Sequence, residues 1–145
     1  MNAIRSAIES VCDPEIPVIT IVDLGVLRDV HQVGDAVTVT ITPTYSGCPA
    51  MDTIREDIVV AATTAGAGSV VVNTVLSPAW TTEWMTDEGR LKLAGFGIAP
   101  PGANPTCPQC AASDPRTVSE FGSTACKALM VCSSCGEPFD RFKDL

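Results

Sequence analysis

The chain has 145 residues, of which 46% are hydrophobic and 18% charged, and its formal net charge is −8. This composition excludes a disordered chain, and the length suits one ordinary domain or a domain of about 100 residues with a small module attached. The acidic balance argues against nucleic acids and anionic membrane surfaces as partners, because both attract basic proteins.

The N-terminal residues predict a short helix rather than an export signal. Residues 1–15 lack the apolar stretch and cleavage site of a secretory signal, and no run of apolar residues reaches the length of about 18 that a membrane span needs. Apolar residues recur at helical spacing over residues 4–11. We expect Asp13-Pro14 to end this helix, because proline disfavours helical geometry in the residue before it.

The following segments predict strands and helices in alternation. Residues 24–33 and 37–42 favour two strands joined by a turn at Gly34-Asp35, the second with strict alternation of apolar residues and threonine. A helix is expected from Pro49 to Gly66, a strand over residues 70–76, and a last helix over residues 86–94. This order predicts the α+β fold class, with helices packed on a small sheet.

The composition changes near residue 100. The Pro/Gly-rich residues 99–108 are typical of a linker, and they predict a first domain over residues 1–100 and a cysteine-rich module over residues 101–145. The first part holds 12 acidic and 5 basic side chains and the second 5 and 4, so the acidity belongs to the first domain.

The tail carries two matched cysteine pairs. Cys107 and Cys110 form one C-x2-C pair, and Cys132 and Cys135 form another, followed by Gly136. A C-x2-C turn directs both of its thiolates at one metal ion, and two such turns complete a tetrahedral site. The tail is therefore predicted to be a four-cysteine, zinc-ribbon-like β module that holds one structural Zn²⁺. Iron or an iron–sulfur cluster is the main alternative to zinc. The tail has few large apolar side chains, so metal binding would supply the stability that its core lacks.

The chain has seven cysteines, three of them outside these pairs. Unpaired thiols and C-x2-C pairs fit a reducing compartment, so we expect a cytoplasmic protein. Cys12 ends the apolar stripe of the first helix and is expected to be buried and inert. Cys126 has two interpretations: a small apolar residue packed in the ribbon, or an additional thiol whose pKa the neighbouring Lys127 and the metal lower.

Cys48 lies directly before the proline at which we expect a helix to begin. The positive end of the helix dipole would favour its thiolate, which could attack, carry sulfur or bind a soft metal. A buried small hydrophobic residue is the alternative. The remaining residue types indicate no catalytic set: His31 is expected to be exposed, Asp13, Glu15 and Asp23 fit helix capping and loop chemistry, and Trp80 and Trp84 fit packing.

These motifs resemble known families. Residues 13–17 (DPEIP), 22–25 (VDLG), 42–49 (TPTYSGCP) and 78–80 (PAW) resemble the iron–sulfur-assembly-associated domain of SufT-type maturation factors, although Ala79 stands where many relatives have a second proline. Residues 97–101 (GIAPP), 119–127 (SEFGSTACK), 137–140 (EPFD) and the two cysteine pairs are similar to the PaaD family of phenylacetate-degradation proteins.

The resemblance implies a non-catalytic role in the system that epoxidises the ring of phenylacetyl-CoA. It implies maturation of a metal centre there, with the 2Fe–2S cluster of the flavin reductase as the expected client and the epoxidase subunits as partners. Cys48 would transiently hold an iron–sulfur cluster or sulfur, with Asp13 and Glu15 in support. A permanent structural subunit, a thiol oxidoreductase and a zinc-ribbon nucleic-acid binder are the alternatives, and a homodimer is left open. The thiol oxidoreductase is a weaker alternative because no thioredoxin-like pattern surrounds the cysteine pairs, and the nucleic-acid binder is weaker because the ribbon is not basic.

Overall fold

A computed structural model describes residues 3–44, 50–102, 105–122 and 126–143. The chain forms two compact units, Met1–Thr86 and Asp87–Leu145, and each is described here by itself. In the described part of the chain, none of the helices has the length and hydropathy that crossing a bilayer requires.

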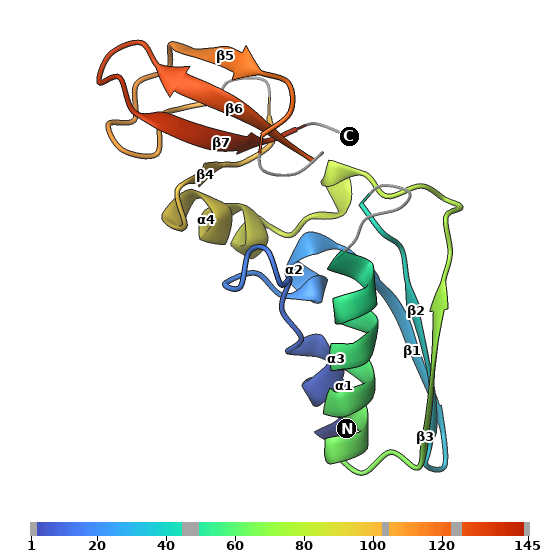
Figure 1. The fold of residues 1–145 in the computed structure, drawn as a ribbon. Coiled ribbons are helices and arrows are strands. Elements are labelled where there is room, and N and C mark those ends of the chain that lie inside the picture. Colours follow the sequence, from blue (N-terminus) through green and yellow to red (C-terminus); the bar gives the residue numbers. More distant parts are fainter. Residues whose placement is uncertain (1–2, 45–49, 103–104, 123–125, 144–145) are drawn as a thin grey trace. The chain divides into compact units, whose positions relative to one another are not determined.

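The first unit is built on a three-stranded sheet in the order β1-β2-β3 (Figure 1). Strands β1 (Leu27–Val33) and β2 (Ala36–Ile41) form an antiparallel hairpin around Gly34, whose φ of 61° suits the tight turn. Strand β3 (Ser69–Thr74) pairs with β2 in parallel, so the chain crosses over between them through helix α3 (Ala50–Thr64). The expected hairpin, helix and strand are thus present with shifted bounds.

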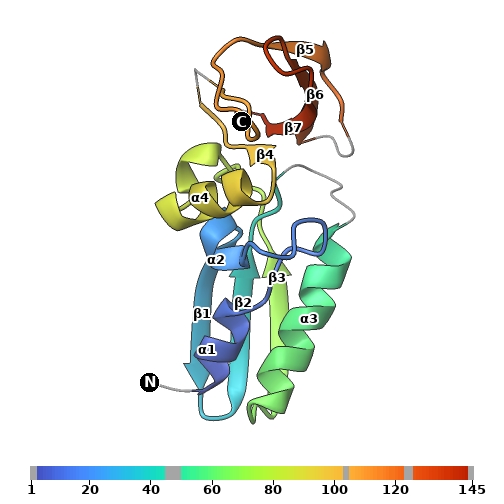
Figure 2. The same cartoon turned by 90° about the vertical axis from the view of Figure 1, so that its left-hand side faces the viewer.

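Two helices cover one face of this sheet. Helix α1 (Ala3–Glu9) and α3 lie on the same side of it in both views (Figures 1 and 2). The inward residues of β2 alternate with outward threonines, as the sequence predicts, and they bury against the helices. The centre of this core consists of fully buried branched side chains, among them Ile8, Ile54, Ile58, Val37 and Val39.

Helix α1 ends earlier than the sequence predicts, at Glu9 rather than at Asp13. Cys12 forms an isolated antiparallel bridge with Thr20, which draws the chain into extended geometry before the proline is reached. The side chain of Asp13 then accepts hydrogen bonds from the amides of Glu15 and Ile16, at 2.7 and 3.0 Å, and closes a turn.

The segment before β1 also differs from the prediction. Residues Ile21–Leu24 form the short helix α2, not the start of a strand, because Thr20 and Asp23 make a reciprocal capping box and Gly25 ends the helix at a φ of 82°. The 3₁₀ turn η1 (Thr82–Trp84) packs closely on Gly25, where an added Cβ would lie 2.6 Å from a backbone oxygen of Trp84. Only glycine fits there.

The two tryptophans pack within the first unit, as the sequence predicts. Trp80 is buried, and its indole N–H donates to the carbonyl of Leu24 at 2.9 Å. The guanidinium of Arg28 stacks over the ring of Trp84, 3.7 Å from its centroid. His31 lies exposed on β1, also as expected.

The second unit contains helix α4 (Asp87–Gly95) and a four-stranded sheet in the order β4-β7-β6-β5. Its strands are β4 (Ile98–Ala99), β5 (Pro115–Ser119), β6 (Lys127–Cys132) and β7 (Pro138–Phe142). Strand β6 pairs antiparallel with β5 and β7, and β4 joins β7 in parallel. The long hairpin of β5 and β6 accounts for the wide separation of the two cysteine pairs.

The predicted linker begins inside this unit. Ala99 is 1% exposed and belongs to the ribbon core, and helix α4 lies in the second compact unit rather than the first. The physical reason is hydrogen bonding that the composition does not reveal. Strand β4 pairs with β7, and Arg90 and Arg141 donate to the carbonyls of Pro101 and Gly102 respectively.

Candidate metal centre

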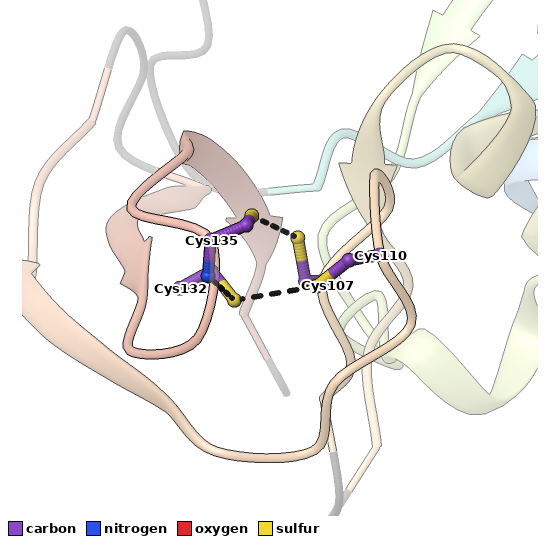
Figure 3. Close-up of side chains that lie close together, drawn as sticks. All are labelled: Cys107, Cys110, Cys132 and Cys135. Atoms are coloured by element: carbon purple, nitrogen blue, oxygen red, sulfur yellow. Dashed lines mark hydrogen bonds between the residues drawn. The ribbon is translucent and has the colours of Figure 1, made fainter.

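Four cysteines converge at one end of the ribbon sheet. Cys107 and Cys110 lie on the turn before β5, Cys132 ends β6, and Cys135 lies on the turn that leads to β7 (Figure 3). Their four Sγ atoms all lie within 4.8 Å of one another, with 3.7 Å between Cys107 and Cys135 and 3.6 Å between Cys110 and Cys132. The structure thus brings together the four residues that the sequence selects.

Each cysteine pair lies on a turn of the same construction. The amide of Ala111 donates to the carbonyl of Cys107 at 2.8 Å, and the amide of Gly136 donates to that of Cys132 at 2.9 Å. Within each turn an amide also points at sulfur: Gln109 N–H to Cys107 Sγ and Cys135 N–H to Cys132 Sγ, both at 3.4 Å. These amides stabilise negative charge on the sulfurs.

The residue after each pair has a positive φ, 64° at Ala111 and 77° at Gly136. The sequence indicates this turn at Gly136, where glycine adopts such a conformation without strain. It gives no such sign at Ala111, where an L side chain is held in the left-handed region. Ala111 directly follows the second cysteine of its pair, as Gly136 does, and this shared position is the signal that could have predicted the positive φ at Ala111.

The thiols influence one another's ionisation. The backbone amide of Cys135 and, more weakly, that of Ser134 lower the pKa of Cys132 to about 7. The amide of Glu137 favours the Cys135 thiolate, but desolvation and the three neighbouring thiols outweigh it and raise the pKa of Cys135 to about 12. The amide of Ala112 lowers the pKa of Cys110, but the hydrogen bond with the Cys132 thiol and desolvation outweigh it, so that the pKa of Cys110 is raised overall. Four thiols this close therefore ionise together only around a cation.

The arrangement fits a tetrahedral metal ion. With metal–sulfur bonds of about 2.3 Å, the edge of a tetrahedron of four sulfurs is about 3.8 Å, close to the distances of 3.7 and 3.6 Å for the Cys107–Cys135 and Cys110–Cys132 pairs. The four cysteines could hold Zn²⁺ or iron in this geometry, since both take tetrahedral thiolate sites. The hydroxyl of Ser134 donates to the carboxylate of Asp114 at 3.1 Å and ties the second turn to the residue before β5.

Two of the four ligands are also core residues. Cys107 and Cys132 are 2% and 1% exposed, whereas Cys110 and Cys135 are exposed. The buried pair packs with three apolar side chains and forms the cluster of Ala99, Cys107, Met130, Cys132 and Phe139. A metal held here would lie between the ribbon core and solvent.

The remaining predicted site residues lie elsewhere. Cys126 is buried directly before β6 and does not belong to the four-sulfur group. Cys12 is half-exposed rather than buried, and its thiol donates to the carbonyl of Ser10 at 3.6 Å. Asp13 is buried in its turn and Glu15 is exposed. Cys48 lies outside the described residues, so its grouping with Asp13 and Glu15 stays a prediction.

Family models match both parts of the chain. Residues 1–74 match a model described as iron–sulfur cluster assembly protein, and residues 100–143 match one described as PaaD zinc beta ribbon domain. Two solved structures share the fold, a DUF59 domain from Bacillus anthracis and a conserved hypothetical protein from Thermotoga maritima. Both are 30% identical, with TM-scores of 0.57 and 0.53, and they cover 62% and 63% of this chain and 87% and 90% of their own.

Two relatives show how far the similarity extends. An Escherichia coli protein, named as a putative subunit of 1,2-phenylacetyl-CoA epoxidase, is 47% identical over 99% of this chain and 92% of its own. A Porphyromonas gingivalis protein named "Fe-S protein maturation auxiliary factor" is 38% identical over 61% of this chain and 85% of its own. The chain therefore belongs to the iron–sulfur cluster assembly protein family, and within it to proteins of the PaaD type that add a zinc β-ribbon domain.

Proposed function

We propose that this protein is a non-catalytic maturation factor for an iron–sulfur centre of the phenylacetyl-CoA epoxidase system. The observation that carries the proposal is the union of two domains in one chain: an iron–sulfur assembly domain and a four-cysteine PaaD ribbon. The first domain alone resembles general maturation factors, whereas the whole chain is similar to a protein named as an epoxidase subunit. On this proposal, the added ribbon directs the iron–sulfur assembly domain to the phenylacetyl-CoA epoxidase system.

The two domains divide the work. In the ribbon, Cys107, Cys110, Cys132 and Cys135 hold one structural Zn²⁺, which fixes the shape of a docking module. In the assembly domain, Cys48 receives an iron–sulfur cluster or sulfur as cargo. Asp13 supports it by holding the turn at residues 13–16, where its carboxylate accepts two backbone amides, and exposed Glu15 lies on the same turn.

The client that best fits is the flavin reductase of the system, since its 2Fe–2S cluster is the iron–sulfur centre that the family resemblance implies. Sulfur or cluster transfer requires a thiolate that is not committed to a structural metal. The ribbon's four cysteines are committed in this way, and Cys126 is buried. Cys12 and Cys48 remain, and we assign the cargo to Cys48, because it lies in the TPTYSGCP segment that carries the family resemblance, whereas the thiol of Cys12 donates to the carbonyl of Ser10.

The test replaces Cys48 by serine in a strain that expresses the full epoxidase system. We expect the purified reductase to lose most of its 2Fe–2S absorbance and iron while its flavin content stays normal. Cys12→Ser is the matched control, because Cys12 is a half-exposed thiol of the same unit, and it should leave the cluster intact. Full cluster occupancy in the Cys48→Ser strain would reject the assignment.

A second candidate function is a permanent structural subunit of the epoxidase. The name of the Escherichia coli relative, which counts that protein among the epoxidase subunits, favours this alternative. The two functions differ in stoichiometry: a permanent subunit co-purifies with the oxygenase subunits in a fixed ratio on size exclusion, whereas a maturation factor does not.

Metal analysis of the purified chain then tests the ribbon, where we expect one zinc and no iron.

A further inference from the structure

The two cysteine turns of the ribbon divide their cysteines in the same way. The second cysteine of each pair, Cys110 and Cys135, is exposed. The first cysteine of each pair, Cys107 and Cys132, is buried, and its sulfur accepts a backbone amide of its own turn. Each turn therefore offers one cysteine to solutes and encloses the other.

Each exposed sulfur lies beside a buried sulfur of the opposite turn. Cys135 Sγ is 3.7 Å from Cys107 Sγ, and Cys110 Sγ is 3.6 Å from Cys132 Sγ (Figure 3). The four sulfurs thus form two pairs that cross from one turn to the other. Each pair joins a cysteine that a solute reaches with a cysteine that only its neighbour reaches.

Access decides which of these sulfurs reacts with an oxidant. A coordinating metal deprotonates a thiol outright, so in the metal-bound ribbon all four are thiolates and ionisation does not separate them. Peroxides oxidise thiolates to sulfenic acids, and susceptibility among thiolates follows exposure. By this criterion the oxidant attacks Cys110 and Cys135. A sulfenic acid then condenses with a neighbouring thiol, and the buried sulfur of each crossing pair is in place to do so.

We propose that Cys110 and Cys135 are oxidative modification sites, at which a peroxide converts the ribbon to a form with two disulfides across the turns, Cys107–Cys135 and Cys110–Cys132. The inference rests on the proposed function for the metal that this site holds. It adds to that function a covalent modification of the docking module.

The chemistry is the same in both pairs. The exposed thiolate attacks one oxygen of hydrogen peroxide, the O–O bond breaks, and hydroxide leaves and is protonated to water. The buried thiolate then attacks the sulfenic sulfur, an S–S bond forms, and a second hydroxide leaves as water. The two sulfurs lose two electrons to one hydrogen peroxide, so each disulfide consumes one peroxide and two protons and yields two waters. A disulfide sulfur carries no negative charge, so the ribbon loses its metal.

The proposed function also supplies a setting for this oxidation. On that proposal the ribbon docks to a system that contains a flavin reductase, and reduced flavins react with O₂ to form peroxide. Folding and metal binding are coupled in small modules, so a ribbon held by two disulfides differs in shape from the metal-bound ribbon. Peroxide formed by the reductase thereby changes the module that docks to this system.

The test treats the purified full chain, whose metal content is measured first, with hydrogen peroxide and a chromophoric chelator. We expect one metal ion per chain to be released as two disulfides form. After alkylation of the remaining thiols, trypsin leaves each C-x2-C pair on its own peptide, residues 93–116 and residues 128–141. Disulfides across the turns link these two peptides, whereas disulfides within a turn do not. Fragmentation of the linked peptides assigns the pairs, and dimedone, which traps sulfenic acids, should label Cys110 and Cys135.

Two variants sharpen the test. Cys135→His keeps a residue that binds zinc and removes one point of attack, so metal release should begin at about half the rate and yield the single disulfide Cys110–Cys132. Cys12→Ser is the matched control, because it removes a half-exposed thiol outside the ribbon and should leave the rate and the peptide map unchanged. If Cys135→His does not bind the metal, the peptide map of the wild type decides.

Three results would each overturn the proposal: disulfides confined to single turns, dimedone on Cys107 or Cys132, or a ribbon that keeps its four thiols in peroxide that fully oxidises glutathione. A purified chain without metal rejects the structural site of the proposed function instead, and the peptide map still decides the pairing of the sulfurs. Full cluster occupancy in the Cys48→Ser strain rejects the cargo role and leaves this proposal standing.

Discussion

The two compact units of this chain build their interiors from different materials. The first unit buries many branched aliphatic side chains, among them Ile8, Ile19, Ile21, Ile41 and Ile58, which are all 0% exposed. The ribbon of the second unit has a cluster of five buried residues, and two of them, Cys107 and Cys132, are also metal-ligand candidates. In one unit the hydrophobic core makes the fold, whereas in the other two cysteines of the candidate metal site are part of the core.

This difference follows from size. A segment of about 40 residues cannot bury enough apolar surface to offset the loss of chain entropy, so small modules depend on metals or disulfides. Thiolate ligation of a metal supplies this stabilisation, about 10–16 kcal/mol in small zinc modules. The two units should therefore fail under different perturbations, and three experiments on the full chain test this contrast.

Loss of the metal should have the largest effect. A strong chelator, or Cys132→Ser, should unfold the ribbon because it removes a ligand and a core side chain together, while the first unit stays folded. Amide resonances of residues 105–143 should collapse in a heteronuclear NMR spectrum, and those of the first unit should persist. If the ribbon keeps its dispersed resonances after complete metal removal, its stability comes from apolar packing and the contrast fails.

Truncation of the aliphatic core should act on the first unit alone. Ile58→Ala leaves a cavity under α3 and should lower the free energy of unfolding by about 2–5 kcal/mol without changing the metal content. Both tryptophans lie in this unit, so urea unfolding followed by tryptophan fluorescence measures it selectively. Thr63→Ala on the same helix is the control: because Thr63 is exposed, the change should alter the free energy by about 0.5 kcal/mol or less.

The two cysteine turns should respond to opposite substitutions, with smaller effects. Gly136→Ala places a side chain at a φ of 77° and should cost about 1–2 kcal/mol, which corresponds to a loss of metal affinity of about 5- to 30-fold. Ala111→Gly relieves the same conformation in the other turn and should leave the affinity equal or higher. Competition with a chromophoric chelator measures both. A loss of affinity of similar size in the two variants would show that backbone conformation is not the cause.

Local patterns predicted most of the elements. Alternation along β2 and the spacing of apolar residues in α3 each report burial within one element, so the sequence contains that information directly. The ends of elements were predicted less well. Helix α1 ends at Glu9 because Cys12 pairs with Thr20, and α2 replaces the expected start of a strand because Thr20 and Asp23 cap it. The Cys12–Thr20 pairing depends on a partner that spacing alone does not specify, whereas the capping box is a local signal that the apolar pattern did not include.

The four-cysteine site lies at the other extreme of predictability. Its ligands were identified from two C-x2-C spacings, because a chelating turn is local and ligand chemistry limits the residue types. The structure adds how unequal the ligands are: two are buried, two are exposed, and the pKa values of Cys132 and Cys135 are shifted in opposite directions. Such differences depend on backbone amides and neighbouring thiols that meet only in the folded ribbon.

By itself, the sequence predicted the α+β class, the four cysteines that the ribbon brings together and the family, because short-range spacing and residue chemistry encode all three. Tertiary structure alone decided that Trp80 bonds to Leu24, that residues 98–99 complete the ribbon sheet, and that β3 lies at an edge of the three-stranded sheet. The physical reason is that burial and pairing between distant segments depend on how the elements pack. Only the folded chain fixes which backbone groups are left without a partner.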